Sequence, residues 1–330
     1  MLLVLPAFAQ TSRFEAGLAL YRDGRLHEAI ELFKASEEGG EIQPLRQFYK
    51  GVCLAKIGRF ESASASLVSY LEIQPTDPHG WFWLSRTQLL QKNFVGARHS
   101  IQRCLNIQPG SSEANRTLGE IELEMGQNQA AYVAWIKAIQ LDPRDSETTY
   151  HLGRLFFEAD FFPEAATWLR QTLRLDPGHF KAATYLALST EHLGDRSTAA
   201  LLYKQGIAQS KLRNSPDSWA YVSYAKLLRQ TGKDAEALSV LEESERLCPN
   251  ASALALLGQI LADLGEKRRA EAVYRRGIQL DPALSGLHYR LSLLLRSAGR
   301  VEEAQKESAL FSAAKKMEEN ARISISAIRQ

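Results

Sequence analysis

Residues 118–143 read LGEIELEMGQNQAAYVAWIKAIQLDP, and residues 152–177 read LGRLFFEADFFPEAATWLRQTLRLDP. The two stretches are offset by 34 residues and share Leu-Gly at the start, Ala in the middle and Leu-Asp-Pro at the end. Working outward from them, a small marker residue recurs at the place of Gly119, in the order Gly17, Gly51, Ser85, Gly119, Gly153, Ala187, Ala225, Gly258 and Ser292. A period of this length predicts stacked supersecondary units, with function on an extended surface.

Three other positions recur with the marker. Alanine stands twelve residues after it in every repeat, at Ala29, Ala63, Ala97, Ala131, Ala165, Ala199, Ala237, Ala270 and Ala304. Glycine stands seven residues after it, at Gly24, Gly58, Gly126, Gly194, Gly232, Gly265 and Gly299. Proline stands twenty-four residues after it, at Pro75, Pro109, Pro143, Pro177, Pro249 and Pro282.

Each recurring residue has a structural cause. Glycine tolerates the left-handed backbone that ends a helix, and proline cannot continue one, so the two residues are expected to close the first and second helix of a repeat. The marker and the alanine are expected where the paired helices approach most closely, because a larger side chain would overpack there. Every repeat is therefore predicted to be a hairpin of two amphipathic helices.

This order of small residue, Gly, Ala, aromatic and Pro resembles the tetratricopeptide repeat. The resemblance covers residues 10–311, as about nine repeats, and implies an all-α, right-handed superhelical solenoid of stacked helical hairpins. Lys92 and Asp160 replace the turn glycine in the third and fifth repeats. The sixth repeat carries an insertion near residues 208–217, which either lengthens a helix or loosens a joint to the seventh; we favour a modest bend there.

The two ends of the chain differ from the repeats. Residues 1–9, MLLVLPAFA, resemble the end of a secretory signal peptide with Ala7-Phe8-Ala9 as the cleavage site, so we expect export to a bacterial periplasm. An apolar cap on a cytoplasmic protein is the alternative. Residues 312–330 are expected to form a capping helix and tail, as terminal repeats require. No other stretch is long and apolar enough to predict a membrane span.

The sequence offers little for catalysis. The seven histidines include no HExxH pair, and Walker, GxGxxG and GxSxG motifs are absent. Cys53, Cys104 and Cys248 form no metal motif, so we expect no metal and no cofactor. A net charge of +2 gives no case for nucleic acid. We therefore predict a protein that is not an enzyme, with a catalytic role centred on His151 or Glu120 as the alternative.

The resemblance also implies where a partner binds, because in this family the first helices of the repeats line a concave groove. The residues facing the groove are expected three and two before each marker and one after it. The candidates are Phe48, Tyr49, Phe82, Trp83, Arg86, Glu120, Tyr150, His151, Arg154, Tyr185 and Lys226. Aromatic residues and arginine dominate binding hot spots, which suits an extended or helical peptide.

Two structural alternatives apply to these candidates. The aromatic residues can serve only to pack neighbouring repeats together, and Arg86, Glu120 and Arg154 can form an ion-pair ladder between repeats, worth about 0.2–1 kcal/mol per exposed pair. The sequence thus predicts a non-enzymatic scaffold that binds a protein or peptide partner of unknown identity. A regulatory or assembly subunit of an envelope enzyme or secretion complex is the first alternative. The catalytic role is the second, and self-association through the open ends is the third.

Overall fold

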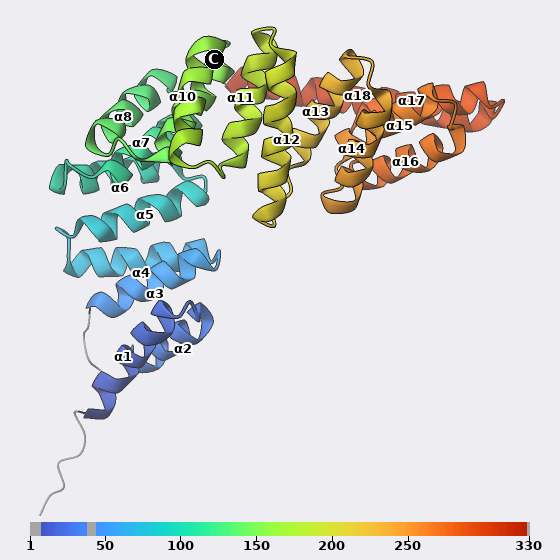
Figure 1. Ribbon diagram of the computed structural model, residues 1–330. Helices are drawn as coiled ribbons and strands as arrows, with labels where there is room; N and C mark the ends of the chain where they lie inside the picture. The colour runs from blue at the N-terminus through green and yellow to red at the C-terminus, as the bar shows by residue number, and fades with distance from the viewer. Residues whose placement is uncertain (1–7, 38–43, 329–330) are drawn as a thin grey trace, which may run out of the picture. The chain divides into compact units, whose positions relative to one another are not determined.

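A computed structural model describes residues 8–37 and 44–328, and that part of the chain is all-α (Figure 1). Its helices are α1 (Phe8–Arg22), α2 (Leu26–Glu37), α3 (Pro44–Lys56), α4 (Phe60–Ile73), α5 (Pro78–Leu90), α6 (Phe94–Ile107), α7 (Ser112–Glu124), α8 (Asn128–Leu141), α9 (Ser146–Glu158), α10 (Phe162–Leu175), α11 (Phe180–His192), α12 (Arg196–Leu212), α13 (Ser218–Gln230), α14 (Asp234–Leu247), α15 (Ala251–Asp263), α16 (Lys267–Leu280), α17 (Ser285–Ser297) and α18 (Val301–Ile328). The predicted fold class is confirmed.

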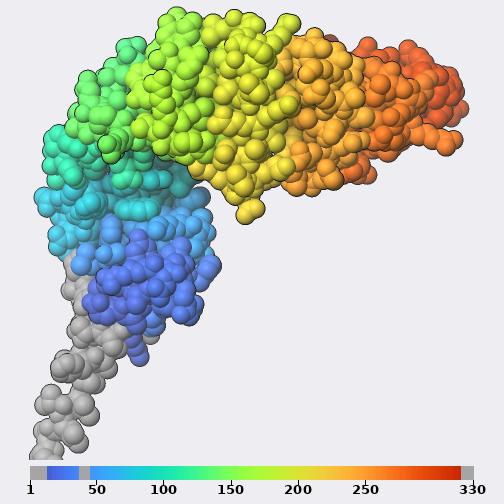
Figure 2. All heavy atoms as spheres, viewed as in Figure 1, coloured from blue at the N-terminus to red at the C-terminus, as the bar shows by residue number. Residues whose placement is uncertain are grey.

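The helices form two compact units, an N-terminal unit up to Leu155 and a C-terminal unit from Phe156 onward. In each unit an odd-numbered helix packs against the even-numbered helix that follows it, as the first and second helices of a predicted repeat should. Within each unit, consecutive hairpins then pack in chain order, which the colours of Figure 1 and Figure 2 make visible. The boundary between the units lies inside α9.

The turn glycines behave as expected. All seven have φ between 74° and 89°, the left-handed region in which a side chain is strained. Lys92 and Asp160 adopt the same geometry, with φ of 61° and 62°. The missing glycine in the third and fifth repeats therefore leaves the turn unchanged, although a residue with a Cβ atom bears the strain.

The predicted close approach of paired helices is also confirmed. The nine recurring alanines are between 0% and 1% exposed. A Cβ atom added to Gly119 would lie 2.3 Å from Nε1 of Trp135, and one added to Gly51 would lie 2.7 Å from Cγ of Leu67. In the third repeat, the Ser85 hydroxyl donates a hydrogen bond to the carbonyl of Ala97 at 2.8 Å. The marker must therefore be small because a large side chain of the second helix lies directly over it.

The closing prolines lie just beyond the second helices: α4 ends at Ile73, two residues before Pro75, and α6 ends at Ile107, two residues before Pro109. Two helices are longer than the second helices of the other repeats. Helix α12 has 17 residues and is followed by Asn214 at φ 50°, so the insertion lengthens a helix. Helix α18 has 28 residues and continues to Ile328. The division into signal, array, joint and cap stays a prediction, and residues 1–7 of the predicted signal lie outside the described residues.

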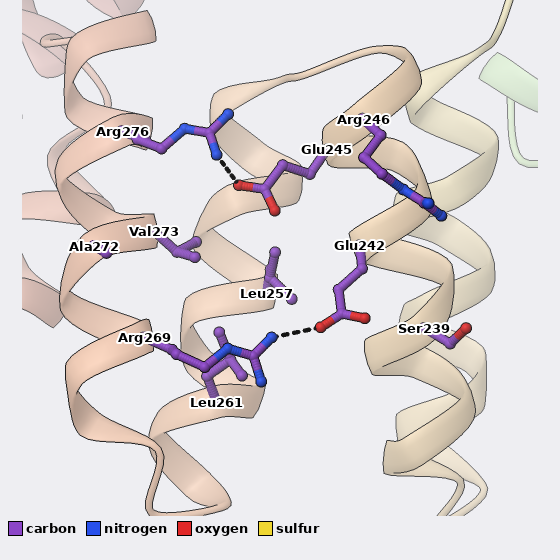
Figure 3. Close-up of a pocket in the computed structure, with 10 residues that line it drawn as sticks. All are labelled: Ser239, Glu242, Glu245, Arg246, Leu257, Leu261, Arg269, Ala272, Val273 and Arg276. Atoms are coloured by element: carbon purple, nitrogen blue, oxygen red, sulfur yellow. Dashed lines mark hydrogen bonds and ion pairs between the residues drawn. The ribbon is translucent and has the colours of Figure 1, made fainter.

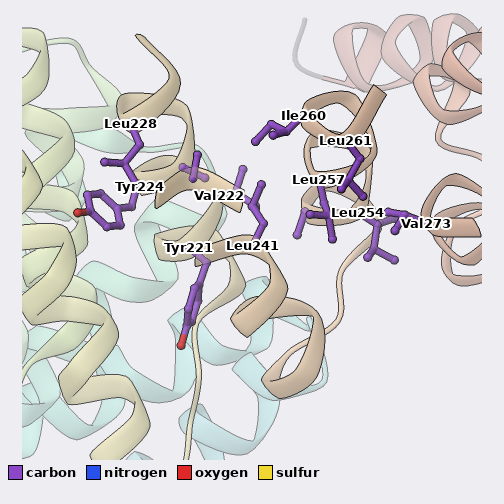
Figure 4. Close-up of a cluster of buried hydrophobic side chains, with 14 of the residues drawn as sticks. Tyr221, Val222, Tyr224, Leu228, Leu241, Leu254, Leu257, Ile260, Leu261 and Val273 are labelled. Carbon is purple, nitrogen blue, oxygen red and sulfur yellow. The ribbon is translucent and has the colours of Figure 1, made fainter. Parts of the chain in front are cut away.

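Much of the buried core of the C-terminal unit is a continuous apolar cluster that runs from Ala187 to Ala304. Figure 4 shows part of it, with Tyr221, Leu241 and Leu254 from α13, α14 and α15. The described clusters of the N-terminal unit are smaller and separate. There, burial raises the pKa of the Cys53 and Cys104 thiols to about 11, so both stay protonated and act as small apolar residues.

Candidate functional site

The first helices of the repeats lie side by side within each unit. Contacts join α1 to α3, α3 to α5 and α5 to α7 in the N-terminal unit, and α13 to α15 and α15 to α17 in the C-terminal unit. We call the surface formed by the exposed side chains of these odd-numbered helices the first-helix face. It is the surface on which the sequence predicts that a partner binds.

The first-helix face of the N-terminal unit is hollowed between α5, α7 and α9. The hollow has a volume of about 350 Å³ and is lined by Leu89, Leu90, Lys92, Phe94, Glu120, Leu123, Glu124, His151 and Arg154. It brings together three predicted groove residues from two successive repeats, Glu120, His151 and Arg154. Its apolar side chains come from the ends of α5 and α7 and from the start of α6, so it combines an apolar lining with charged groups.

His151 is fixed in this hollow from two sides. Its ring stacks on the buried ring of Trp135, with centroids 5.2 Å apart and planes 6° apart. Its Nε2 lies 3.5 Å from Oε1 of Glu120, while its buried Nδ1 has no hydrogen-bond partner among the described residues. The same Glu120 oxygen lies 3.8 Å from Nε of Arg116. Both distances from Glu120 are long for hydrogen bonds, so this carboxylate keeps accepting capacity for another group.

The predicted aromatic residues fall into two groups. Phe82 and Tyr150 are buried, at 9% and 7% exposure, so they pack between helices and offer a ligand little surface. The other four, Phe48, Tyr49, Trp83 and Tyr185, are half-buried. The packing alternative therefore describes Phe82 and Tyr150, whereas the half-buried rings keep an exposed edge.

The charged candidates also differ from one another, in whether a carboxylate lies near them. Arg86 is exposed, with its guanidinium 5.8 Å above the Phe82 ring and Nη1 3.7 Å from Oε1 of Glu113 on α7. Nη1 of Arg116 reaches Oδ2 of Asp145 at 2.9 Å, which adds a second link along this face. An ion-pair ladder between repeats is thus partly present. Lys226, in the C-terminal unit, is exposed and has no carboxylate partner in the part of the chain that the structure describes.

A second hollow lies in the C-terminal unit, mainly on second helices of the repeats. It has a volume of about 510 Å³ and is lined by α14, α15 and α16 (Figure 3). Two ion pairs cross it, from Arg269 to Glu242 and from Arg276 to Glu245, both at 2.6 Å. These arginines belong to the basic runs Lys267-Arg268-Arg269 and Arg275-Arg276, and their partners lie 27 and 31 residues away.

Sequence reasoning missed two features of the first-helix face. Leu90 lines the hollow at 57% exposure, and Trp219 is 40% exposed beside Tyr185, with ring centroids 4.8 Å apart. Trp219 precedes Lys226 by seven residues, which is two helical turns, so helical spacing alone could have placed it on this face. No comparable signal identifies Leu90.

No group of three or more His, Cys, Asp or Glu side chains among the described residues could hold a metal ion. No helix of that part of the chain combines the length and the apolar character needed to cross a membrane.

Stacked helical hairpins with closely packed small residues define a repeat solenoid. Family models of the tetratricopeptide repeat match residues 116–180, 150–218 and 251–284. Together with the helical hairpins of both units, these matches show that the chain is a tetratricopeptide repeat protein.

Two curated relatives are members of one assembly. The BBSome complex member bbs-4 of Caenorhabditis elegans is 23% identical over 309 residues, covering 80% of this chain and 66% of that protein. The BBSome complex member BBS4 of Bos taurus is 24% identical over 190 residues, covering 57% of this chain and 36% of that protein. The matches thus span at most two thirds of these relatives' own length.

Solved structures show the same fold at low identity. The Cut9-Hcn1 hetero-tetramer of the APC/C is similar with a TM-score of 0.60 and 13% identity, covering 88% of this chain and 57% of that one. A tetratricopeptide repeat protein from Parabacteroides merdae is similar with a TM-score of 0.57 and 19% identity, covering 76% of this chain and 98% of that one. These likenesses concern the fold alone.

Proposed function

We propose that this protein is a non-enzymatic scaffold that binds a protein or peptide partner along its first-helix face. The observation that carries the proposal is the hollow between α5, α7 and α9, in which an apolar lining meets Glu120, His151 and Arg154. Binding sites commonly combine an apolar concavity with a few polar groups that fix orientation. The hollow would take an apolar side chain of the partner beside Leu90 and Phe94.

The polar groups of the hollow support recognition of a peptide rather than of an apolar surface. Glu120 makes only long contacts with His151 and Arg116, so its carboxylate can accept a hydrogen bond from a backbone or side-chain N–H group of the partner. Arg86 and Trp83, one repeat earlier, would continue the contact along α5. A peptide that crosses successive first helices would therefore meet an anchor and a polar contact in each repeat.

The test is affinity purification of the tagged protein from its own cells, followed by mass spectrometry. A Leu90→Glu variant places a charge at the exposed edge of the hollow and should lose the partner. A Val95→Glu variant is the matched control, because Val95 is 74% exposed in the same repeat and does not line the hollow. Circular dichroism checks that both variants are folded. Recovery of the same partners with Leu90→Glu would move binding away from this hollow.

A second candidate function is that of an assembly or regulatory subunit in a larger complex, such as an envelope enzyme or secretion machine. It is favoured by two curated relatives, which are named as members of the BBSome complex. A scaffold of this kind would co-purify with fixed stoichiometry and elute with its partners in size-exclusion chromatography. Partners that dissociate during the column run would favour transient peptide capture instead.

We also propose that residues 1–9 direct export and that the mature protein begins at Gln10. The support is the Ala7-Phe8-Ala9 pattern directly before the first repeat. Mass spectrometry of the protein purified from its native cells tests this directly. An amino terminus at Met1 would instead favour an apolar cap and a cytoplasmic location.

A further inference from the structure

The first-helix face of the C-terminal unit is unbalanced in charge. Helices α11, α13, α15 and α17 carry five Lys and Arg side chains, namely Lys181, Lys226, Arg229, Arg290 and Arg296. They carry only two carboxylates, Glu191 and Asp263. The imbalance arises from four successive repeats, so it is a property of this surface and not of one helix.

Both carboxylates are already occupied. Glu191 accepts a hydrogen bond from the Tyr203 hydroxyl at 2.9 Å, and Asp263 pairs with Arg229 at 2.7 Å. Asp217, which precedes α13, accepts the backbone N–H of Trp219 as a helix cap. Four cations of this face, Lys181, Lys226, Arg290 and Arg296, therefore have no carboxylate within ion-pair distance among the described residues.

The second helices of the same unit are closer to charge balance, since α10, α12, α14, α16 and α18 together carry 15 Lys and Arg and 12 Asp and Glu residues. Some of their cations pair between repeats, as in the bridges of Figure 3 from Arg269 and Arg276 to α14. Lys211 pairs with Glu243 at 2.6 Å, and Arg300 pairs with Glu271 at 2.7 Å. The first-helix face therefore differs from the second helices in its excess of cations over carboxylates, and not in holding every unpaired cation.

Exposed apolar side chains lie on two of the helices that carry these unpaired cations. Trp219 is 40% exposed, Tyr289 48% and Leu293 45%, and all three belong to α13 or α17. The Trp219 ring meets the Tyr185 ring edge to face. A surface that carries both large aromatic rings and unpaired Lys or Arg side chains combines anchors with unsatisfied charges, which is the composition of binding hot spots.

We propose that this face of the C-terminal unit docks an acidic segment of a partner protein, in which Asp or Glu residues alternate with apolar ones. The carboxylates pair with Lys226, Arg296 and their neighbours, and the apolar side chains pack against Trp219. Charge complementarity selects an acidic partner, since a basic or neutral segment would leave the cations unpaired. The inference rests on the proposed function and adds the chemistry of the partner.

The test uses the full chain and a short fluorescent peptide in which Glu alternates with Leu and Phe. A matched peptide carries Gln in place of Glu, and a short single-stranded DNA serves as a polyanion of another class. Fluorescence anisotropy should show binding of the acidic peptide that weakens as salt is added. The Gln peptide and the DNA should bind more weakly.

Variants then locate the contact. Lys226→Gln with Arg296→Gln should weaken binding of the acidic peptide by about threefold to tenfold. Arg246→Gln with Arg268→Gln is the matched control, because it removes the same charge from exposed residues of α14 and α16 that have no ion-pair partner in the described structure. The control should stay within about twofold of the wild type.

Several results would overturn the inference. These are no binding of the acidic peptide, equal loss in both double variants, or tighter binding of the DNA. Equal binding of both peptides, weakened in both by Trp219→Ala, would refute the acidic preference while leaving the proposed scaffold function intact. The scaffold proposal is tested separately by Leu90→Glu in the other unit, so the two can fail independently.

Discussion

Trp135 shows what the 34-residue period requires of a single position. Its ring is fully buried, and its Nε1 donates a hydrogen bond to the Arg116 carbonyl at 3.1 Å. The ring lies directly over Gly119, and Tyr274 lies over Gly258 in the same way four repeats later. The small marker and the large residue sixteen positions on are therefore one packing pair, repeated along the chain.

This packing pair predicts how much one added methyl group should lower the stability of the protein. Gly119→Ala should lower the free energy of unfolding by about 1–3 kcal/mol, because the new Cβ atom overlaps the Trp135 ring. Urea denaturation measures the loss. Gly110→Ala is the control, since a Cβ atom at Gly110 meets nothing within 4 Å. In the Trp135→Leu background the added methyl should cost much less, and an unchanged cost there would contradict the pairing.

At Lys92 the opposite change, from a larger residue to glycine, is expected to stabilise the protein. Its φ of 61° is costly for a residue with a Cβ atom, and the other turns at this place use glycine. Lys92→Gly should therefore raise the free energy of unfolding by about 0.5–1 kcal/mol, the strain relieved less the entropy that glycine loses. Thermal denaturation checks this. Gly58→Lys, at the same place one repeat earlier, should destabilise the protein, and a neutral result would refute the strain argument.

At the scale of elements, α17 depends on α18 for its amino-terminal cap. Leu284, which precedes α17, provides no side-chain cap. The Glu318 carboxylate instead accepts hydrogen bonds from the Ser285 backbone N–H at 2.9 Å and from its hydroxyl at 3.0 Å. Since both contacts come from the part of α18 beyond residue 311, the extra length of this helix stabilises the final hairpin.

Removing this cap should therefore be measurable. Glu318→Ala should lower the free energy of unfolding by about 1 kcal/mol, the typical loss on deleting a helix cap. Glu319→Ala, one residue further on and exposed, is the control and should have little effect. Denaturation curves that coincide for Glu318→Ala and the wild type would show that α18 does not cap α17.

The hairpins could be predicted from sequence because their ends are fixed by residues with special backbone properties. Gly58 and Pro75, and their equivalents, mark the turns without reference to anything distant. The ion pairs could not be predicted, because long side chains such as Arg269 can reach several carboxylates and geometry decides among them. The candidate groove falls between these cases: helical spacing places Tyr150 on the right helix, but only the packing shows that its ring is buried.

At the scale of the whole molecule, the cores of the two units are organised differently. An apolar cluster of the C-terminal unit continues from Ala187 to Ala304, whereas the described clusters of the N-terminal unit are smaller and separate. In a repeat protein each hairpin is stabilised mainly by its neighbours, so a local loss spreads only as far as the packing is continuous. The C-terminal unit is therefore expected to open more cooperatively than the N-terminal one.

A substitution that creates a cavity in the larger cluster would test this expectation. Leu254 is fully buried at its centre, on α15, and Leu254→Ala should cost about 2–5 kcal/mol. Hydrogen exchange followed by mass spectrometry should then show faster exchange across α13 to α17, while α3 to α5 exchange as in the wild type. Ile101→Ala, in one of the smaller clusters, should raise exchange only in its own neighbourhood. Faster exchange along the whole chain in either variant would mean that the units unfold together, because coupling between them would then outweigh the packing within each.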